Sequence, residues 1–316
     1  MGDTIEFPNE LERLLYLGKK YYDQQDYLKS LECFKGHYQE ELTLEVNTYL
    51  VKISLKLGQI DEALDYVKEF EQDYRNHERL QPIYLDVLLK KRLFLQVEKW
   101  FVQLNESHQL KDAFKDTLDK TQDYWTMVDN NEYRHHVSRC QNLVNEEMVQ
   151  QIKLAKECDY LTKADFIEIV TKRILCDDQV SIFIRNQFID ELVQLKEKST
   201  VEVLTVFNQL VTVNLDDTDR LMPTILTHPL YQKLSHYMED NYTSQEQMVL
   251  GVLKAHLGMM YPCLERCIVN VDDWLQAYLI YFGFDLTLDN RVEERAMHIL
   301  SSIQHLDTIM MNTMTK

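Results

Sequence analysis

A pattern of large and small residues that recurs in the first third of the chain constrains the fold most strongly. The interval from Leu17 to Leu50 is 33 residues, and the interval from Leu50 to Tyr84 is 34 residues. The matching positions are Leu14, Leu17, Gly18, Tyr21, Ser30 and Phe34, then Asn47, Leu50, Val51, Ser54, Ala63 and Val67, then Gln81, Tyr84, Leu85, Leu88, Val97 and Phe101. A fixed interval of this length is typical of stacked helical hairpins, in which each unit buries its apolar face against its neighbour.

The small members of the pattern are Gly18, Ser30 and Ala63. Small side chains at these positions let the two helices of one hairpin approach closely, while aromatic residues fill the space between hairpins. The second and third copies carry larger residues at the glycine position, and the third also has Val97 where the others have a small residue. We therefore interpret the third copy as a degenerate repeat that can cap the array.

On these residues, segment 1–106 resembles three tetratricopeptide repeats. The whole chain, with Leu221-Met222-Pro223, His228-Pro229 and Met260-Tyr261-Pro262 in its second half, is similar to cytosolic helical-repeat proteins of low-GC Gram-positive bacteria. The resemblance implies a right-handed α-α superhelix that serves as a scaffold for other polypeptides.

The scarcity of glycine and proline supports an all-α fold. The chain has 7 glycines and 5 prolines among 316 residues, about a third of their average share. Sandwiches, barrels and other sheet folds use these residues in tight turns, so we expect no sheet. With 45% apolar residues the chain can also bury a sizeable core.

The net charge and the cysteines restrict partners and location. A charge of −18 repels phosphate backbones and anionic lipid, so we expect neither a nucleic acid nor a membrane as partner. No apolar stretch approaches the length of a bilayer span, and the acidic N-terminus does not resemble a signal peptide. The 6 cysteines are scattered rather than clustered, which is typical of a reduced, cytoplasmic setting.

Residues 107–316 are predicted to form a helical extension that packs continuously on the repeats. Apolar periodicity predicts helices over 111–129, 132–144, 146–158, 163–175, 180–195, 200–213, 230–239, 244–258, 262–268, 271–283 and 290–310. The pair within 163–195 resembles a HEAT repeat, which implies that Asp178 in the turn lies close to Arg185 in the second helix. The alternative is that both side chains are merely exposed.

The sequence offers no convincing catalytic or cofactor motif. It contains neither Gly-x-Gly-x-x-Gly nor a Walker loop, which argues against nucleotide binding of those types. His136 with Cys140, and His256 with Cys263 and Cys267, have spacings that can chelate zinc, but neither set supplies four convincing ligands. Half-buried helix faces are the alternative. We therefore predict no enzyme activity, no catalytic residues, no metal and no cofactor.

The repeat register predicts a binding groove. If Leu14, Leu17 and Tyr21 pack inward, a second stripe on each first helix lines the concave surface of the array. We call these residues the groove stripe: Leu15, Lys19, Tyr22, Lys52, Leu55, Lys56, Asp86, Leu89 and Lys90. Its lysines would attract an acidic segment and its apolar members would supply contact area. The alternative is that the lysines are ordinary solvated residues.

These features favour a protein- or peptide-binding adaptor, with another protein or an extended acidic peptide as partner. The alternative is a regulator that senses a small peptide and acts through a protein partner. Because the repeats begin by about residue 11, we expect no DNA-binding domain ahead of them.

Overall fold

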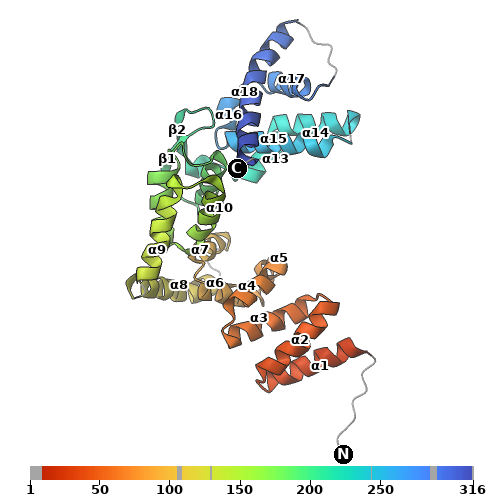
Figure 1. Ribbon diagram of the computed structural model, residues 1–316, viewed down its shortest axis with the longest axis vertical. Helices are drawn as coiled ribbons and strands as arrows, with labels where there is room; N and C mark the ends of the chain where they lie inside the picture. The colour runs from red at the N-terminus through yellow and green to blue at the C-terminus, as the bar shows by residue number, and fades with distance from the viewer. Residues whose placement is uncertain (1–8, 105–108, 129, 243, 285–289, 315–316) are drawn as a thin grey trace, which may run out of the picture. The chain divides into compact units, whose positions relative to one another are not determined.

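The structure is a computed structural model that describes residues 9–104, 109–128, 130–242, 244–284 and 290–314. It is mainly helical, with 77% of residues in helices (Figure 1). The predicted predominance of helix is confirmed. Contacts divide the chain into two compact units, Met1–Asn130 and Asn131–Lys316.

The first unit contains the helices of all three predicted hairpins. Its elements are α1 (Glu10–Asp23), α2 (Tyr27–Glu40), α3 (Leu44–Leu57), α4 (Ile60–Glu69), α5 (Glu71–Asn76), α6 (Gln81–Lys90), α7 (Phe94–Gln103) and α8 (Gln109–Met127). Helix α5 is a short addition, between the second and third hairpins, that the repeat pattern does not predict. The pairs α1–α2, α3–α4 and α6–α7 each pack together, and α2 also packs on α3.

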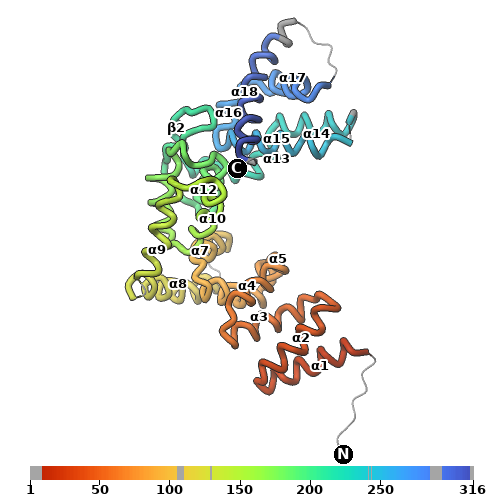
Figure 2. The backbone as a smooth tube through the Cα atoms, viewed as in Figure 1, coloured from red at the N-terminus to blue at the C-terminus, as the bar shows by residue number. Residues whose placement is uncertain are grey.

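The first hairpin shows why its small residues are needed. Helices α1 and α2 lie side by side in the backbone trace (Figure 2). A Cβ atom added to Gly18 would lie 2.9 Å from the ring of Phe34, which is fully buried. The hydroxyl of Ser30 donates a hydrogen bond of 2.8 Å to the carbonyl oxygen of Gly18. A small residue on each helix therefore permits the close contact, as the sequence predicts.

We expect Gly18→Ala to lower the free energy of unfolding of the first unit by about 1 kcal/mol or more. Overpacking a core costs about 1–3 kcal/mol, which exceeds the helix-propensity gain of up to about 1 kcal/mol. The matched control is Gly251→Ala on an exposed helical surface, where an added Cβ would meet no atom within 4 Å; this change should stabilise its unit by about 0.5–1 kcal/mol. Thermal unfolding followed by circular dichroism measures both, and equal shifts would contradict the packing argument.

The first unit extends past the repeats to include α8. The ring of Trp125 on this helix is 1% exposed and contacts Phe94 edge to face, with ring centroids 5.5 Å apart. The guanidinium of Arg92 lies 4.6 Å from the Trp125 ring centroid, a cation–π contact. The compact unit thus continues past the repeats to residue 130.

The second unit is helical except for one hairpin. Its elements are α9 (Asn130–Gln141), η1 (Asn142–Asn145), α10 (Met148–Glu157), η2 (Cys158–Tyr160), α11 (Lys163–Ile169), the π-helix η3 (Val170–Ile174), α12 (Ile182–Gln194), β1 (Thr200–Leu204), β2 (Leu210–Asn214), η4 (Leu215–Asp217), α13 (Leu221–Thr227), α14 (Pro229–Asn241), α15 (Glu246–Met260), α16 (Leu264–Cys267), α17 (Val271–Tyr281) and α18 (Asn290–Met314). Within the described residues, no helix combines the length and the apolar character needed to cross a membrane.

The helix predicted over 200–213 is wrong, and so is the expectation of no sheet. Strands β1 and β2 pair antiparallel, from Thr200 opposite Asn214 to Leu204 opposite Leu210. Val201 and Val203 are buried, while Thr200 and Glu202 between them are exposed. Alternating β-branched residues suit a half-buried strand, and the amide of Leu204 donates to the carbonyl of Leu175, which anchors the hairpin at 2.9 Å.

The HEAT-like segment also departs from its prediction. The helix predicted over 163–175 is α11 followed by the π-helix η3, whose wider turn is marked by the hydrogen bond from Leu175 N to Val170 O. Among the described residues, no ion pair joins Asp178 to Arg185. Asp178 is exposed, whereas Arg185 is only 5% exposed, so neither the direct pair nor two exposed side chains is found.

Candidate functional site

The aromatic and aliphatic members of the groove stripe at its N-terminal end contribute to the core of the first unit. Leu15 and Tyr22 are partly buried and pack against the cluster formed by α2 and α3. Tyr22 meets Tyr27 and Tyr49 edge to face, with ring centroids 5.7 and 5.2 Å apart. Burial raises the pKa of the Tyr22 hydroxyl above its usual value. These side chains therefore offer only their outer edges to a ligand.

The lysines of the stripe differ in their partners. Lys19 forms an ion pair of 2.6 Å with Glu45, and Lys90 forms one of 2.8 Å with Asp86. Lys52 Nζ lies 5.7 Å from the ring centroid of Tyr49. Among the described residues neither Lys52 nor Lys56 has an acidic partner, so these two carry the uncompensated positive charge of the stripe.

Two leucines of the stripe differ in exposure. Leu55 is partly exposed on α3, whereas Leu89 is 5% exposed. The expectation that Leu89 faces a ligand is wrong, because α6 packs against α3, α4, α5, α7 and α8 and is covered on several sides. The exposed members of the groove stripe are Lys56 on α3 and Lys90 on α6.

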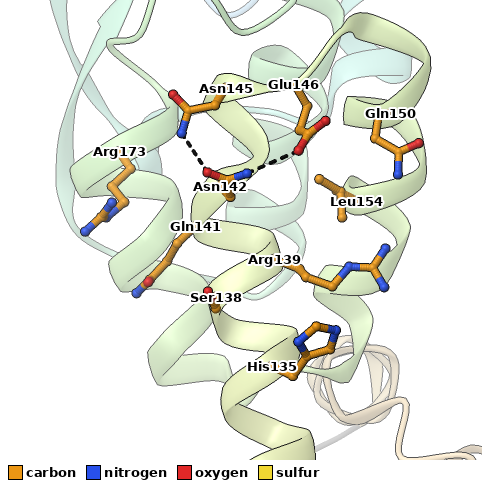
Figure 3. Close-up of a pocket in the computed structure, with 10 residues that line it drawn as sticks. All are labelled: His135, Ser138, Arg139, Gln141, Asn142, Asn145, Glu146, Gln150, Leu154 and Arg173. Carbon is orange, nitrogen blue, oxygen red and sulfur yellow. Dashed lines mark hydrogen bonds between the residues drawn. The ribbon is translucent and has the colours of Figure 1, made fainter.

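A polar pocket of about 400 Å³ lies in the second unit, which the sequence did not single out. Figure 3 shows that its side chains come from α9, η1, α10 and the π-helix η3. They are His135, Ser138, Arg139, Gln141, Asn142, Asn145, Glu146, Gln150, Leu154 and Arg173. We call it the Asn142 pocket, because the 3₁₀ turn η1 is central to it.

Hydrogen bonds hold the turn of the Asn142 pocket in place. Asn145 Nδ2 donates to Asn142 Oδ1 at 2.7 Å, and Asn142 Nδ2 donates to Glu146 Oε1 at 3.1 Å, as the dashed lines of Figure 3 show. Carboxamide side chains often form such local bonds in turns. The turn is therefore an ordered part of the pocket surface.

The two arginines of the Asn142 pocket are not equivalent. Arg139 forms an ion pair of 2.7 Å with Glu157. Arg173 is exposed, lies in the π-helix and has no acidic partner among the described residues. π-helical turns are frequent at functional sites, and nothing in the residue types around Arg173 would reveal one from sequence. The pocket can therefore offer a guanidinium and several amides to the oxygen atoms of a ligand.

The histidines of the two candidate zinc sets have other neighbours in the structure. His136 stacks on Tyr160, with ring centroids 4.9 Å apart, and His256 Nδ1 lies 3.0 Å from the hydroxyl of Tyr278. Burial lowers the pKa of His256 to about 4, so its ring is neutral at pH 7. Within the described residues, no group of three or more His, Cys, Asp or Glu side chains could hold a metal ion.

Comparisons of the chain with protein-family models, with curated proteins and with solved structures find no match in any of the three.

Proposed function

We propose that this protein is an adaptor that binds another protein or an extended peptide through the groove stripe of its first unit. In this proposal the three hairpins form a tetratricopeptide-like, right-handed superhelix whose first helices line the binding surface. The observation that supports it is the close packing of α1 on α2, where Gly18 contacts the ring of Phe34 and accepts a hydrogen bond from Ser30. The repeat pattern requires small residues at these two positions so that the helices can approach.

The charges of the first unit favour an acidic ligand segment at α3. Lys52 and Lys56 lie one turn apart, and residues four apart share a helix face. Neither is neutralised by an acidic partner among the described residues, unlike Lys19 and Lys90. Partly exposed Leu55 beside them supplies apolar contact. A partner segment with acidic and apolar residues would complement this surface.

The partner can be identified by affinity capture with the tagged full-length chain from cytosol of the source cells, followed by mass spectrometry. A stoichiometric protein supports the adaptor. A short peptide recovered alone would instead favour the alternative, a peptide-sensing regulator that acts through a protein partner.

The double variant Lys52→Glu with Lys56→Glu should weaken binding of the captured partner at least tenfold, which corresponds to about 1.4 kcal/mol. Reversing two charges replaces attraction of an acidic segment with repulsion. The matched control is Lys20→Glu with Arg79→Glu, which makes the same charge change at exposed positions outside the stripe. Calorimetric titration measures both, and similar affinity loss in the two double variants would contradict a site at the stripe.

A further inference from the structure

A second pocket of the second unit has a volume of about 980 Å³. It is formed by the end of η1, the start of α10, the turn before α12 with the first turn of that helix, the loop between β1 and β2, and the last turns of α18. We call it the Arg185 pocket. Its charged lining residues are Glu146, Glu147, Asp178 and Arg185.

The side chain of Arg185 is buried in this pocket, and two of its three guanidinium nitrogens lack a hydrogen-bond acceptor among the described residues. The residue is 5% exposed, and among the described residues its Nε and Nη1 atoms have no acceptor. A guanidinium has five N–H donors and stays charged in proteins. A buried charge without a partner is strongly destabilising, so an acceptor brought by a ligand would offset a cost that the free protein carries.

The nearest acidic residues do not supply that acceptor. Asp177 and Asp178 favour the charged form of Arg185 and oppose the lowering of its pKa by burial. However, Asp177 Oδ1 accepts from the amide of Gln179 at 2.8 Å, and Asp178 Oδ1 accepts from the Gln179 side chain at 2.9 Å. Both carboxylates are thus engaged in the turn before α12 rather than on the guanidinium.

The other charged groups of the pocket restrict the ligand further. Glu146, Glu147 and Asp178 line the same pocket. Glu147 and Asp178 are exposed. Glu147 precedes α10 without a side-chain capping hydrogen bond. A doubly charged anion such as phosphate would be repelled by these carboxylates. A molecule that carries one carboxylate and one ammonium group satisfies both the buried cation and the acidic residues.

We propose that the Arg185 pocket binds a zwitterion, either a free α-amino acid or a short peptide with free termini. Its carboxylate would accept hydrogen bonds from Arg185, and its ammonium group would lie near Glu147 and Asp178. Pockets of about 300–1,000 Å³ are typical for small ligands, so the volume accommodates several residues. The inference concerns the second unit alone and does not depend on the groove stripe of the first.

Thermal unfolding of the full-length protein with defined probes tests the proposal. The probes are the twenty amino acids, a random tripeptide library with free termini, and the same library N-acetylated or C-amidated. Sodium phosphate at equal ionic strength is the anion control. A free-termini probe should raise the melting temperature by at least about 2 °C at saturating concentration, and blocking either terminus should remove most of the shift. If the amino acids raise the melting temperature, the ligand is a free amino acid; if only the tripeptides do so, the ligand is a short peptide. No shift with either, or a shift with phosphate alone, would overturn the proposal.

Variants locate the site. Arg185→Gln should weaken binding of the most effective probe by about tenfold to a hundredfold, as expected when charge-assisted hydrogen bonds to a carboxylate are lost. The control Arg173→Gln, at an exposed arginine of the other pocket, should leave the affinity unchanged. Unchanged affinity in a folded Arg185→Gln protein would exclude this pocket.

If Arg185→Gln does not fold, the double variant Glu147→Gln with Asp178→Asn tests the site instead, because both substituted residues are exposed. It should weaken the free-termini probe at least fivefold and leave the N-acetylated probe unaffected, because only the former carries an ammonium group. The matched control Glu239→Gln changes an exposed acidic residue of α14 outside the pocket. Equal effects on both probes would overturn the proposal.

Discussion

Replacing Asn47 with alanine should lower the free energy of unfolding of the first unit by about 3–5 kcal/mol, because each buried polar group left without a partner costs about 1–3 kcal/mol. Asn47 is fully buried. Its Nδ2 atom donates to the hydroxyl of Tyr38 at 2.8 Å and to the carbonyl of Tyr66 at 2.9 Å, and its Oδ1 atom accepts from the hydroxyl of Tyr74 at 2.9 Å.

The surrounding network makes these partners hard to replace. Tyr38 also donates a hydrogen bond to Glu69, and burial raises its pKa well above the usual value. Burial likewise raises the pKa of Tyr74, to about 12. Both hydroxyls therefore stay protonated at neutral pH. Tyr38 keeps Glu69 as its acceptor, whereas Tyr74 donates to Asn47 Oδ1 and would lose that bond. Asn47 joins residues of α2, α4 and α5 to α3, so its loss should loosen three helix contacts at once.

Denaturant unfolding followed by tryptophan fluorescence measures this loss. A Trp274→Phe background leaves Trp100 and Trp125, both in the first unit, as the reporters. Asn76→Ala is the control, because Asn76 is exposed at the end of α5, and it should change stability by no more than about 0.5 kcal/mol. A loss below about 1 kcal/mol for Asn47→Ala would mean that water replaces the missing amide.

Trp125→Ala should also cost about 3–5 kcal/mol, the usual range for truncating a large buried aromatic residue to alanine. The change removes the ring that contacts Phe94 and lies under the guanidinium of Arg92. Because these contacts join α8 to the third hairpin, the loss should appear both in the stability of the first unit and in the opening of α8.

Circular dichroism measures the stability, and amide hydrogen exchange of residues 109–127 measures the opening of the helix. The neighbouring Tyr124→Ala is the control, since Tyr124 is 58% exposed and its truncation should change stability by about 0.5 kcal/mol or less. Equal losses for the two substitutions, or exchange rates of α8 that do not rise in Trp125→Ala, would contradict the assignment of α8 to the first unit.

The repeat spacing and the small residues were sufficient to predict the helices of the three hairpins and the close approach of α1 and α2 at Gly18 and Ser30. The helices follow from local periodicity, which relates residues three and four positions apart on one helix face, and the close approach follows from the small residues that recur with the repeat. The additional helix α5 and the docking of Trp125 could not be predicted in this way. They depend on which surfaces of neighbouring hairpins remain uncovered after the hairpins pack.

The hairpin β1–β2 shows a second reason why the sequence alone did not predict the fold. Its alternating valines are compatible with a strand, but a two-stranded hairpin is marginal by itself. It is held by the burial of Val201 and Val203 and by the hydrogen bond from Leu204 to Leu175. The carbonyl of Leu175 accepts this bond just after the π-helix ends. The sequence pattern at 163–175 predicts an ordinary α-helix and does not indicate the π-helix.

By itself the sequence determined that the chain is mainly helical, where most helices lie, and which residues share a helix face, because these follow from composition and from the 3.6-residue period. Only the tertiary structure decided which faces are covered. It buries Leu89 of the groove stripe under neighbouring helices, leaves Lys56 exposed, and buries Arg185 with no acceptor for its Nε and Nη1 atoms among the described residues. Burial is set by contacts between segments far apart in the chain, and local periodicity carries no information about them.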